Sequence, residues 1–179
     1  MRKHRASLFA AALLLAVATS SIGIPAKSLF ADTSQPATQL EQSEIQMWRL
    51  INNDRTASPN ASETRGRANP LVWDARLAAV ARQHSEEMAE NGFFSHQGLD
   101  GSLPYVRVSK AGIRWRASAE NIAKYSDVAQ AEAGFMNEPK FQHNHRGNIL
   151  NPEYTHVGVG IARGPDGMLY ITQEFADVF

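Results

Sequence analysis

Histidine is the residue type in this chain that points most directly to chemistry. Three of its six histidines, His143, His145 and His156, fall within residues 143–160, HNHRGNILNPEYTHVGVG. A neutral imidazole can ligate a metal ion, and its proton equilibrium lies near physiological pH. His84 instead repeats with the apolar positions of a helical stripe and is expected in the core. Any site must therefore combine the first group with histidines or acids from elsewhere in the chain.

The composition argues against several kinds of catalytic site. The absence of cysteine excludes a cysteine nucleophile, thiolate metal ligands and a lipidated cysteine anchor. Neither the HExxH pattern of zinc peptidases nor a GxSxG nucleophile elbow occurs. Ser95 and His96 are adjacent, and neighbours in sequence seldom face each other as a Ser-His-acid triad requires. These sequence motifs therefore give no support to a catalytic site.

The N-terminal residues predict export. Basic residues at positions 2, 3 and 5 precede Leu8–Val17, an apolar run of about ten residues, which is short for a membrane span. Residues 1–31 are therefore predicted to be a signal peptide and leader, cut after residue 18, 26 or 31, with an uncleaved membrane anchor as the alternative. Residues 32–42 are expected to form a flexible linker, and residues 43–179 a single domain.

The charge balance bears on the partners. A cut after residue 18 leaves 15 Lys and Arg against 18 Asp and Glu, a net charge of about −3. Without a basic stripe, nucleic acid is not expected as a partner. No second apolar run is long enough to span a membrane once the signal is removed. The mature protein is therefore expected to be secreted, either extracellular or periplasmic.

Hydrophobic periodicity predicts helices followed by a β-hairpin. The ranges 39–56, 103–111 and 127–137 are expected to be helical, as is a segment that starts after Asp74 and stops at Gly92. Residues 113–123 could include a strand, and 156–161 and 168–175 form the hairpin through RGPDG. This order indicates an α+β fold with a sheet covered by helices. Gly158 and Gly160 share one face, where they let something approach the sheet closely.

Apolar matching sets the expected register of the hairpin. Pairing Ile161 with Leu169 places His156 directly opposite Glu174. A one-residue slip would instead put Val157 opposite Glu174 and waste an apolar position. A cross-strand pair of opposite charge contributes roughly 0.2–1 kcal/mol. The sequence therefore predicts a His156–Glu174 pair, either a stabilising pair at the rim or part of a ligand site.

Five segments, in order along residues 45–176, resemble the CAP superfamily, the cysteine-rich secretory, antigen 5 and pathogenesis-related proteins with an SCP domain. The absence of cysteine resembles its bacterial branch. Each segment is weak alone, but five in family order at plausible spacing form a specific pattern. The segments are LVWDARLAAVARQHSEEMAENGFFSH, DGSLPYVRVSKAGI, AENIA, FMNEP and HRGNILNPEYTHVGVGIA.

The resemblance implies a three-layer α-β-α sandwich with a central antiparallel sheet and a cleft that holds two histidines and two acids. Carried over by motif, the histidines are His96 and His145, and the acids are Glu120 and Glu138. Two imidazoles with carboxylates suit zinc or another divalent cation, and His96, His145 and Glu120 are the expected ligands. The alternative is a hydrogen-bonded polar cluster in which each Glu fixes a His tautomer.

The chain departs from the family pattern in three places. Ala119 stands where the family has glycine, and Phe135 where a tryptophan is common. Four extra residues lie between Pro139 and His145. Next to the acid of the family motif, Asn121 either supports the cleft floor or forms a turn.

The resemblance implies binding of a small ligand, lipid-like or peptide, or of an extracellular partner protein at this cleft. His156 and Glu174 either border the cleft or stand apart from it. One alternative is a metal-dependent hydrolase or protease, with Glu120 as the catalytic residue. Another is an extracellular interaction protein whose cleft is inactive. Five aromatic residues are expected mainly in the core, and an exposed pair among them would favour a lipid or glycan groove: Phe93, Phe94, Tyr105, Trp115 and Tyr125.

Overall fold

The computed structural model describes residues 38–179. The predicted signal peptide, its cleavage sites and the first part of the linker lie outside these residues. The elements, in order, are α1 Gln39–Thr56, the 3-10 turn η1 Ser58–Asn60, β1 Val72–Trp73, α2 Ala75–Asn91, α3 Pro104–Lys110, β2 Trp115–Tyr125, α4 Val128–Met136, α5 His145–Leu150, β3 His156–Arg163 and β4 Leu169–Val178. No helix in this part of the chain is long and apolar enough to cross a membrane.

Helix α1 begins where the sequence offers a capping box. The Thr38 hydroxyl accepts from the Glu41 N–H at 3.2 Å, and the Glu41 carboxylate accepts from the Thr38 N–H at 2.7 Å. These bonds satisfy backbone donors that the first turn leaves unpaired. Residues 39–42, where the predicted helix and the predicted linker overlapped, therefore form the first turn of α1.

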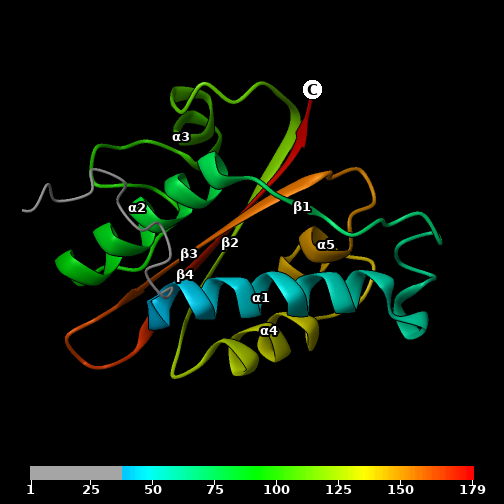
Figure 1. Ribbon diagram of the computed structural model, residues 1–179, viewed down its shortest axis with the longest axis horizontal. Coiled ribbons are helices and arrows are strands. Elements are labelled where there is room, and N and C mark those ends of the chain that lie inside the picture. Colours follow the sequence, from blue (N-terminus) through cyan, green and yellow to red (C-terminus); the bar gives the residue numbers. More distant parts are fainter. Residues whose placement is uncertain (1–37) are drawn as a thin grey trace, which may run out of the picture. The chain divides into compact units, whose positions relative to one another are not determined.

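The sheet has the order β1-β3-β4-β2, with helices on both faces. Helices α2 and α3 lie on one side of it, and α1, α4 and α5 lie on the other (Figure 1). This is the expected three-layer α-β-α arrangement. The expected antiparallel pairing is confirmed for β3, β4 and β2, and at one edge the two-residue strand β1 pairs with β3 in parallel. Strand β2 forms the opposite edge and pairs only with β4.

Two glycines explain how closely α2 lies on the sheet. A Cβ atom at Gly158 would fall 2.0 Å from the Ala78 nitrogen, and one at Gly160 would fall 1.9 Å from the Arg82 nitrogen. Both distances are far inside van der Waals contact, so only glycine allows this approach. The predicted close approach is confirmed, and the approaching partner is the backbone of α2.

The larger apolar core lies on the opposite face, between the sheet and α1, α4 and α5. The inward residues of β3, Val157, Val159 and Ile161, are fully or almost fully buried there. They alternate with the glycines that face α2, as the period-two pattern of a strand requires. Other buried members of this core are Met47, Ile51, Phe135, Ile149, Ile171 and Phe175.

The hairpin register differs from the prediction by two residues. Ile161 pairs with Ile171 rather than with Leu169, and His156 lies opposite Ala176. The cause is a shorter turn: the Gly164 N–H donates to the Met168 carbonyl, so β3 continues to Arg163 before the chain reverses. The predicted His156–Glu174 pair was therefore wrong. A shift of two keeps each side chain on its expected face, which is why the apolar pattern could not reveal it.

Candidate functional site

His96 and Glu120 form the first histidine–acid pair. His96 lies in the loop that follows α2, and its Nδ1 is 2.7 Å from the Oε1 atom of Glu120 on the edge strand β2. An ionised carboxylate only accepts hydrogen bonds, so Nδ1 carries the proton and donates it. The His96 side chain is 49% exposed, whereas that of Glu120 is 1% exposed. Glu120 thus fixes the tautomer of a ring that solvent can reach.

Arg107 anchors this pair from α3. Its guanidinium donates to the carbonyl of His96 at 3.0 Å and to the Oε2 atom of Glu120 at 2.5 Å. It also donates to the Ser102 carbonyl, which ties the loop after α2 to the start of α3. Both oxygens of Glu120 are therefore occupied. Arg107 also lines a cavity of about 360 Å³ together with His84.

Glu174 lies beneath the pair and is fully buried. It faces Glu120 directly across strands β2 and β4, and Arg107 lies 3.9 Å away. Burial, together with the neighbouring Glu120 charge, raises the pKa of Glu174 well above its ordinary value. Burial also opposes ionisation of Glu120, but the His96 hydrogen bond and the Arg107 charge outweigh it and lower the pKa of Glu120. Among the described residues, neither Glu174 oxygen has a hydrogen-bond partner, so burial favours the neutral, protonated form of this acid.

His145 and Glu138 form the second pair. Glu138 follows α4, and its Oε1 atom is 2.6 Å from Nδ1 of His145, the first residue of α5. Its Oε2 atom accepts from the His145 backbone N–H at 2.9 Å. A carboxylate at the start of a helix satisfies an unpaired N–H and interacts favourably with the helix dipole. The His145 ring also packs against Phe135, with ring centroids 4.7 Å apart.

Asn121 connects the two pairs across the edge strand. It follows Glu120 in β2, so its side chain points to the opposite face of the sheet. Its amide donates to the His145 carbonyl at 3.1 Å and to the Gln173 side chain at 2.9 Å. It accepts from the amide of Asn148 at 2.8 Å. Asn121 is fully buried in a strand, so it supports the site and does not form a turn.

The remaining histidines lie outside the two pairs. His84 is buried as expected, and its Nε2 lies 2.8 Å from the Ser95 carbonyl oxygen. His143 is exposed in the loop before α5. His156 is half-buried, and its Nδ1 lies 2.8 Å from the Thr155 hydroxyl.

The arrangement leaves the same atom available on both histidines. Each ring uses Nδ1 for its acid. No hydrogen bond within the described range engages Nε2 of His96 or of His145. This is the arrangement in which an acid orients a metal-ligating histidine. Across residues 38–179, no group of three or more His, Asp or Glu side chains is placed to hold a metal ion. The described residues therefore show two separate histidine–acid pairs, each with one imidazole nitrogen that no hydrogen bond engages.

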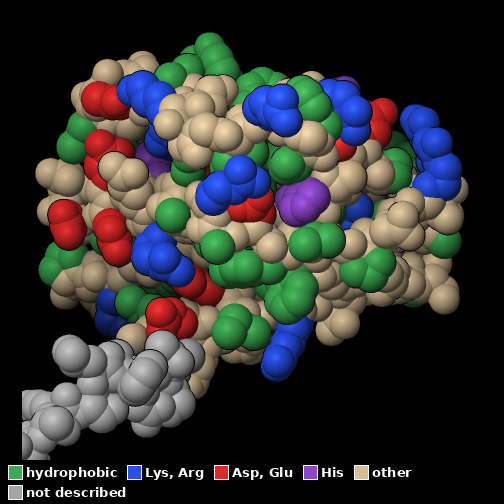
Figure 2. Space-filling model, turned by 45° about the horizontal axis from the view of Figure 1, so that its top comes forward, with side chains coloured by type: hydrophobic (Ala, Val, Ile, Leu, Met, Phe, Trp, Pro, Cys, Tyr) green, Lys and Arg blue, Asp and Glu red, His purple; other side chains and the backbone are tan. Residues whose placement is uncertain are grey.

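Aromatic side chains near the first pair reach solvent. The rings of Phe94 and Tyr105 are 50% and 49% exposed, although both were expected mainly in the core. Phe94 precedes His96 by two residues, and Tyr105 lies in α3 with Arg107. Figure 2 shows a face on which acidic, basic, histidine and hydrophobic side chains are interspersed, without a large patch of one sign.

Sequence reasoning missed one arginine of the site and one pair of buried acids. Arg107 sits within an apolar helix pattern, YVRV, which gave no sign of a partner. The second is a buried acid pair on the far side of the sheet, where Glu132 of α4 meets Asp54 of α1. Burial raises the pKa of Glu132 to about 8, and its carboxylate accepts from Gln173 at 3.0 Å. A glutamate among the apolar residues VAQAEAGFM was the available signal.

The fold agrees with comparisons to known proteins. The family model of the cysteine-rich secretory protein family, CAP, matches residues 48–175. The chain belongs to this family, and the absence of cysteine fits its bacterial branch.

Two curated relatives come from Bacillus subtilis (strain 168). The chain is 38% identical to the uncharacterized membrane protein YlbC over 106 residues, which is 59% of this chain and 28% of YlbC. It is 33% identical to the uncharacterized protein YkwD over 117 residues, 65% of this chain and 43% of YkwD. The matched region thus spans less than half the length of either relative.

A solved structure extends the likeness to the fold. The crystal structure of an extracellular protein containing an SCP domain from Bacillus anthracis str. Ames superposes with a TM-score of 0.59 and 29% identity. The match covers 80% of this chain and 45% of that chain.

Proposed function

We propose that this protein acts outside the cytoplasm as a non-catalytic binding module, and that His96 and His145 bind its ligand through a divalent cation. The observation that carries the proposal is the hydrogen-bonding pattern that the two rings share. Each donates Nδ1–H to a carboxylate and keeps Nε2 available. Zinc suits neutral imidazole and would act as a Lewis acid toward an oxygen of the ligand.

The location outside the cytoplasm is supported by the predicted signal peptide and by the extracellular SCP-domain protein of Bacillus anthracis. The ligand class is supported by the exposed rings of Phe94 and Tyr105, which offer apolar contact near His96. A small peptide or lipid-like molecule with a polar head would combine the two kinds of contact.

Metal-dependent hydrolysis is less well supported, because its base would have to be Glu120. That carboxylate is almost completely buried, and both its oxygens are bound by His96 and Arg107. A general base must lie within hydrogen-bond reach of a substrate proton. Glu120 is better suited to positioning His96 than to contacting a substrate.

The test is zinc titration calorimetry on the mature protein at about pH 7.5. The wild type should bind one zinc ion in the micromolar range or tighter, and the His96→Ala/His145→Ala variant should not. The matched control is His143→Ala, which removes an exposed histidine outside both pairs and should bind like the wild type.

Equal binding by the wild type and the double variant would contradict the proposal, as would an absence of binding by the wild type. The two pairs would then be hydrogen-bonded clusters that brace the fold around β2. If only one of the single variants, His96→Ala or His145→Ala, loses zinc binding, the ion is assigned to the pair that this variant disrupts.

A further inference from the structure

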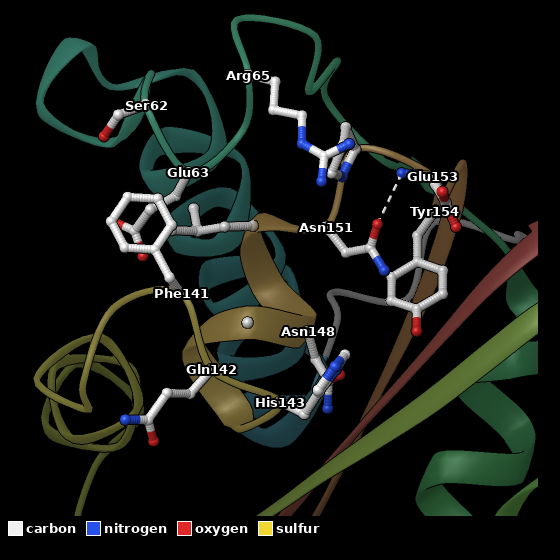
Figure 3. Close-up of a pocket in the computed structure, with 13 residues that line it drawn as sticks. Ser62, Glu63, Arg65, Phe141, Gln142, His143, Asn148, Asn151, Glu153 and Tyr154 are labelled. Carbon is white, nitrogen blue, oxygen red and sulfur yellow. Dashed lines mark hydrogen bonds between the residues drawn. The ribbon is translucent and has the colours of Figure 1, made fainter.

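The larger cavity of the domain lies away from the two exposed imidazoles. It has a volume of about 490 Å³, within the range of small-molecule sites. The loop after α1, the loop before α5 and the segment between α5 and β3 form its walls (Figure 3). Neither His96 nor His145 lines it, so a ligand in this cavity would bind independently of the proposed function.

Two strained residues meet at this cavity. Within residues 38–179, the non-glycine residues with positive φ are Arg65, at 53°, and Phe141, at 59°. Both line the cavity. Left-handed backbone is unfavourable for residues with a Cβ atom, and such strain collects at ligand sites. The chain therefore holds these two side chains in place at a cost in backbone energy.

Neither of these side chains is used to hold the fold together. The Arg65 residue is exposed, and no described hydrogen bond or ion pair engages its guanidinium. The Phe141 side chain is 74% exposed. Figure 3 shows Phe141 on one side of the cavity and Asn151 and Tyr154 on the other, with Arg65 between them. A guanidinium of this kind can bind a carboxylate through two parallel N–H donors.

The other lining groups favour hydroxyl-rich molecules over lipids. The amides of Gln142, Asn148 and Asn151 offer donors and acceptors, and Glu153 on the rim offers acceptors for O–H groups. The acid Glu63 is already compensated, because Arg146 donates to both its oxygens at 2.6 and 2.9 Å. The Arg65 guanidinium thus remains available for a negatively charged group of a ligand.

The wall that carries Phe141 depends on a glycine of α5. A Cβ atom at Gly147 would fall 2.1 Å from the Gln142 carbonyl oxygen, so residues 141–143 lie against the helix only because residue 147 is glycine. The position of the loop before α5 thus depends on a residue of the helix that follows it.

We propose that this cavity binds an acidic sugar, a pyranose of the uronic acid class. Its carboxylate binds the Arg65 guanidinium, and the C–H face of its ring packs on Phe141, because an exposed aromatic ring offers a flat apolar surface. Its hydroxyls bond to the lining amides and to Glu153. The ligand is either a free monosaccharide or the end of an acidic polysaccharide.

The experiment is an amide NMR titration of the mature protein with D-glucuronate at millimolar concentration. D-glucose tests the need for the carboxylate, and acetate tests the need for the ring. Glucuronate should shift the amides of residues 62–65, 141–148, 151, 153 and 154, whereas glucose and acetate should bind at least about tenfold more weakly.

Two variants and a control make the result specific. Arg65→Gln should weaken glucuronate binding at least about tenfold. Phe141→Asn should weaken it severalfold, since asparagine tolerates the left-handed region but lacks the ring. Arg67→Gln removes the same charge from an exposed arginine outside the cavity and should leave binding unchanged. The amide spectrum of each variant reports whether it is folded.

The proposal would be overturned by several results. No shifts with glucuronate at millimolar concentration, or equal binding by Arg65→Gln and the wild type, would remove the site. Equal affinity for acetate or for a short peptide carboxylate would show a general carboxylate site. If glucuronate binds, an oligoglucuronate that binds more tightly would identify the polymer end as the source.

Discussion

Glu132 offers the sharpest test of the buried electrostatics, through the variant Glu132→Gln. This acid is 3% exposed and lies between Asp54 and Gln173. Its carboxyl group accepts a hydrogen bond from Gln173 at 3.0 Å and lies near the Asp54 carboxyl group. Glutamine has nearly the same shape and keeps a carbonyl acceptor for Gln173, but it carries no titratable proton.

The expected effect follows from proton linkage. Burial raises the pKa of Glu132 from 4.5 to about 8 in the folded protein. Between these values the native state holds a proton that the unfolded state has lost, so the free energy of unfolding falls as the pH rises. The full shift corresponds to about 5 kcal/mol, and each pH unit inside the window to about 1.4 kcal/mol. The contribution of Glu132 to the free energy of unfolding is thus fully present below about pH 4.5 and is lost as the pH rises through about 8.

The assay is urea denaturation at several pH values between about 5 and 8. The free energy of unfolding of the wild type should fall between pH 5 and pH 8 by about 4 kcal/mol more than that of Glu132→Gln. Glu90→Gln, which alters an exposed acid of α2, should follow the wild type. If Glu132→Gln and the wild type show the same pH slope, the proton assigned to Glu132 is absent and the reasoning is refuted.

Two further predictions concern the face that α2 covers. Glu174→Gln should also reduce the loss of stability with rising pH in urea unfolding, because burial and the Glu120 charge raise the pKa of Glu174 and keep it protonated in the fold; an unchanged slope would mean that Glu174 is ionised. Gly158→Ala should destabilise the domain by at least about 2 kcal/mol at any pH, since its Cβ would lie 2.0 Å from the Ala78 nitrogen; a smaller loss in urea unfolding would mean that α2 can move away at little cost.

Much of the fold could be predicted because local signals and periodicity agree. The predicted range 39–56 is that of α1, and Asp74 and Gly92 cap α2 as expected, with Gly92 at φ 67°. The short strand β1 was missed because two residues carry no detectable period, and its pairing depends on β3, far along the chain. Helix α5 was missed for a similar reason, since its six residues include a glycine.

The site was predictable as pairs of residue types but not as a network. The resemblance supplied His96, Glu120, Glu138 and His145, and the structure joins each histidine to one of the acids. It could not supply Arg107, which reaches Glu120 from a separate helix.

Glu174 shows why the register mattered. A hairpin can shift by two residues without changing which face a side chain occupies, so the sequence placed Glu174 on its correct face beside the wrong partner. The true pairing sets it opposite Gly158 on β3 and Glu120 on β2. The prediction of its partner required the length of the turn, which RGPDG alone does not determine.

Buried acids on the two faces of the sheet are connected to neighbouring residues of the same edge strand, β2. Glu174 lies against Glu120, which orients His96, while Glu132 bonds to Gln173 and through it to Asn121, which holds the His145 carbonyl. Burying an acid costs free energy unless it is neutralised and hydrogen-bonded, and a hydrophobic residue would avoid that cost. Burial and a neighbouring carboxylate raise the pKa of both Glu174 and Glu132, so each is held neutral beside its partner acid. On the α2 side the negative charge therefore lies on Glu120, which keeps the His96 ring in one tautomer.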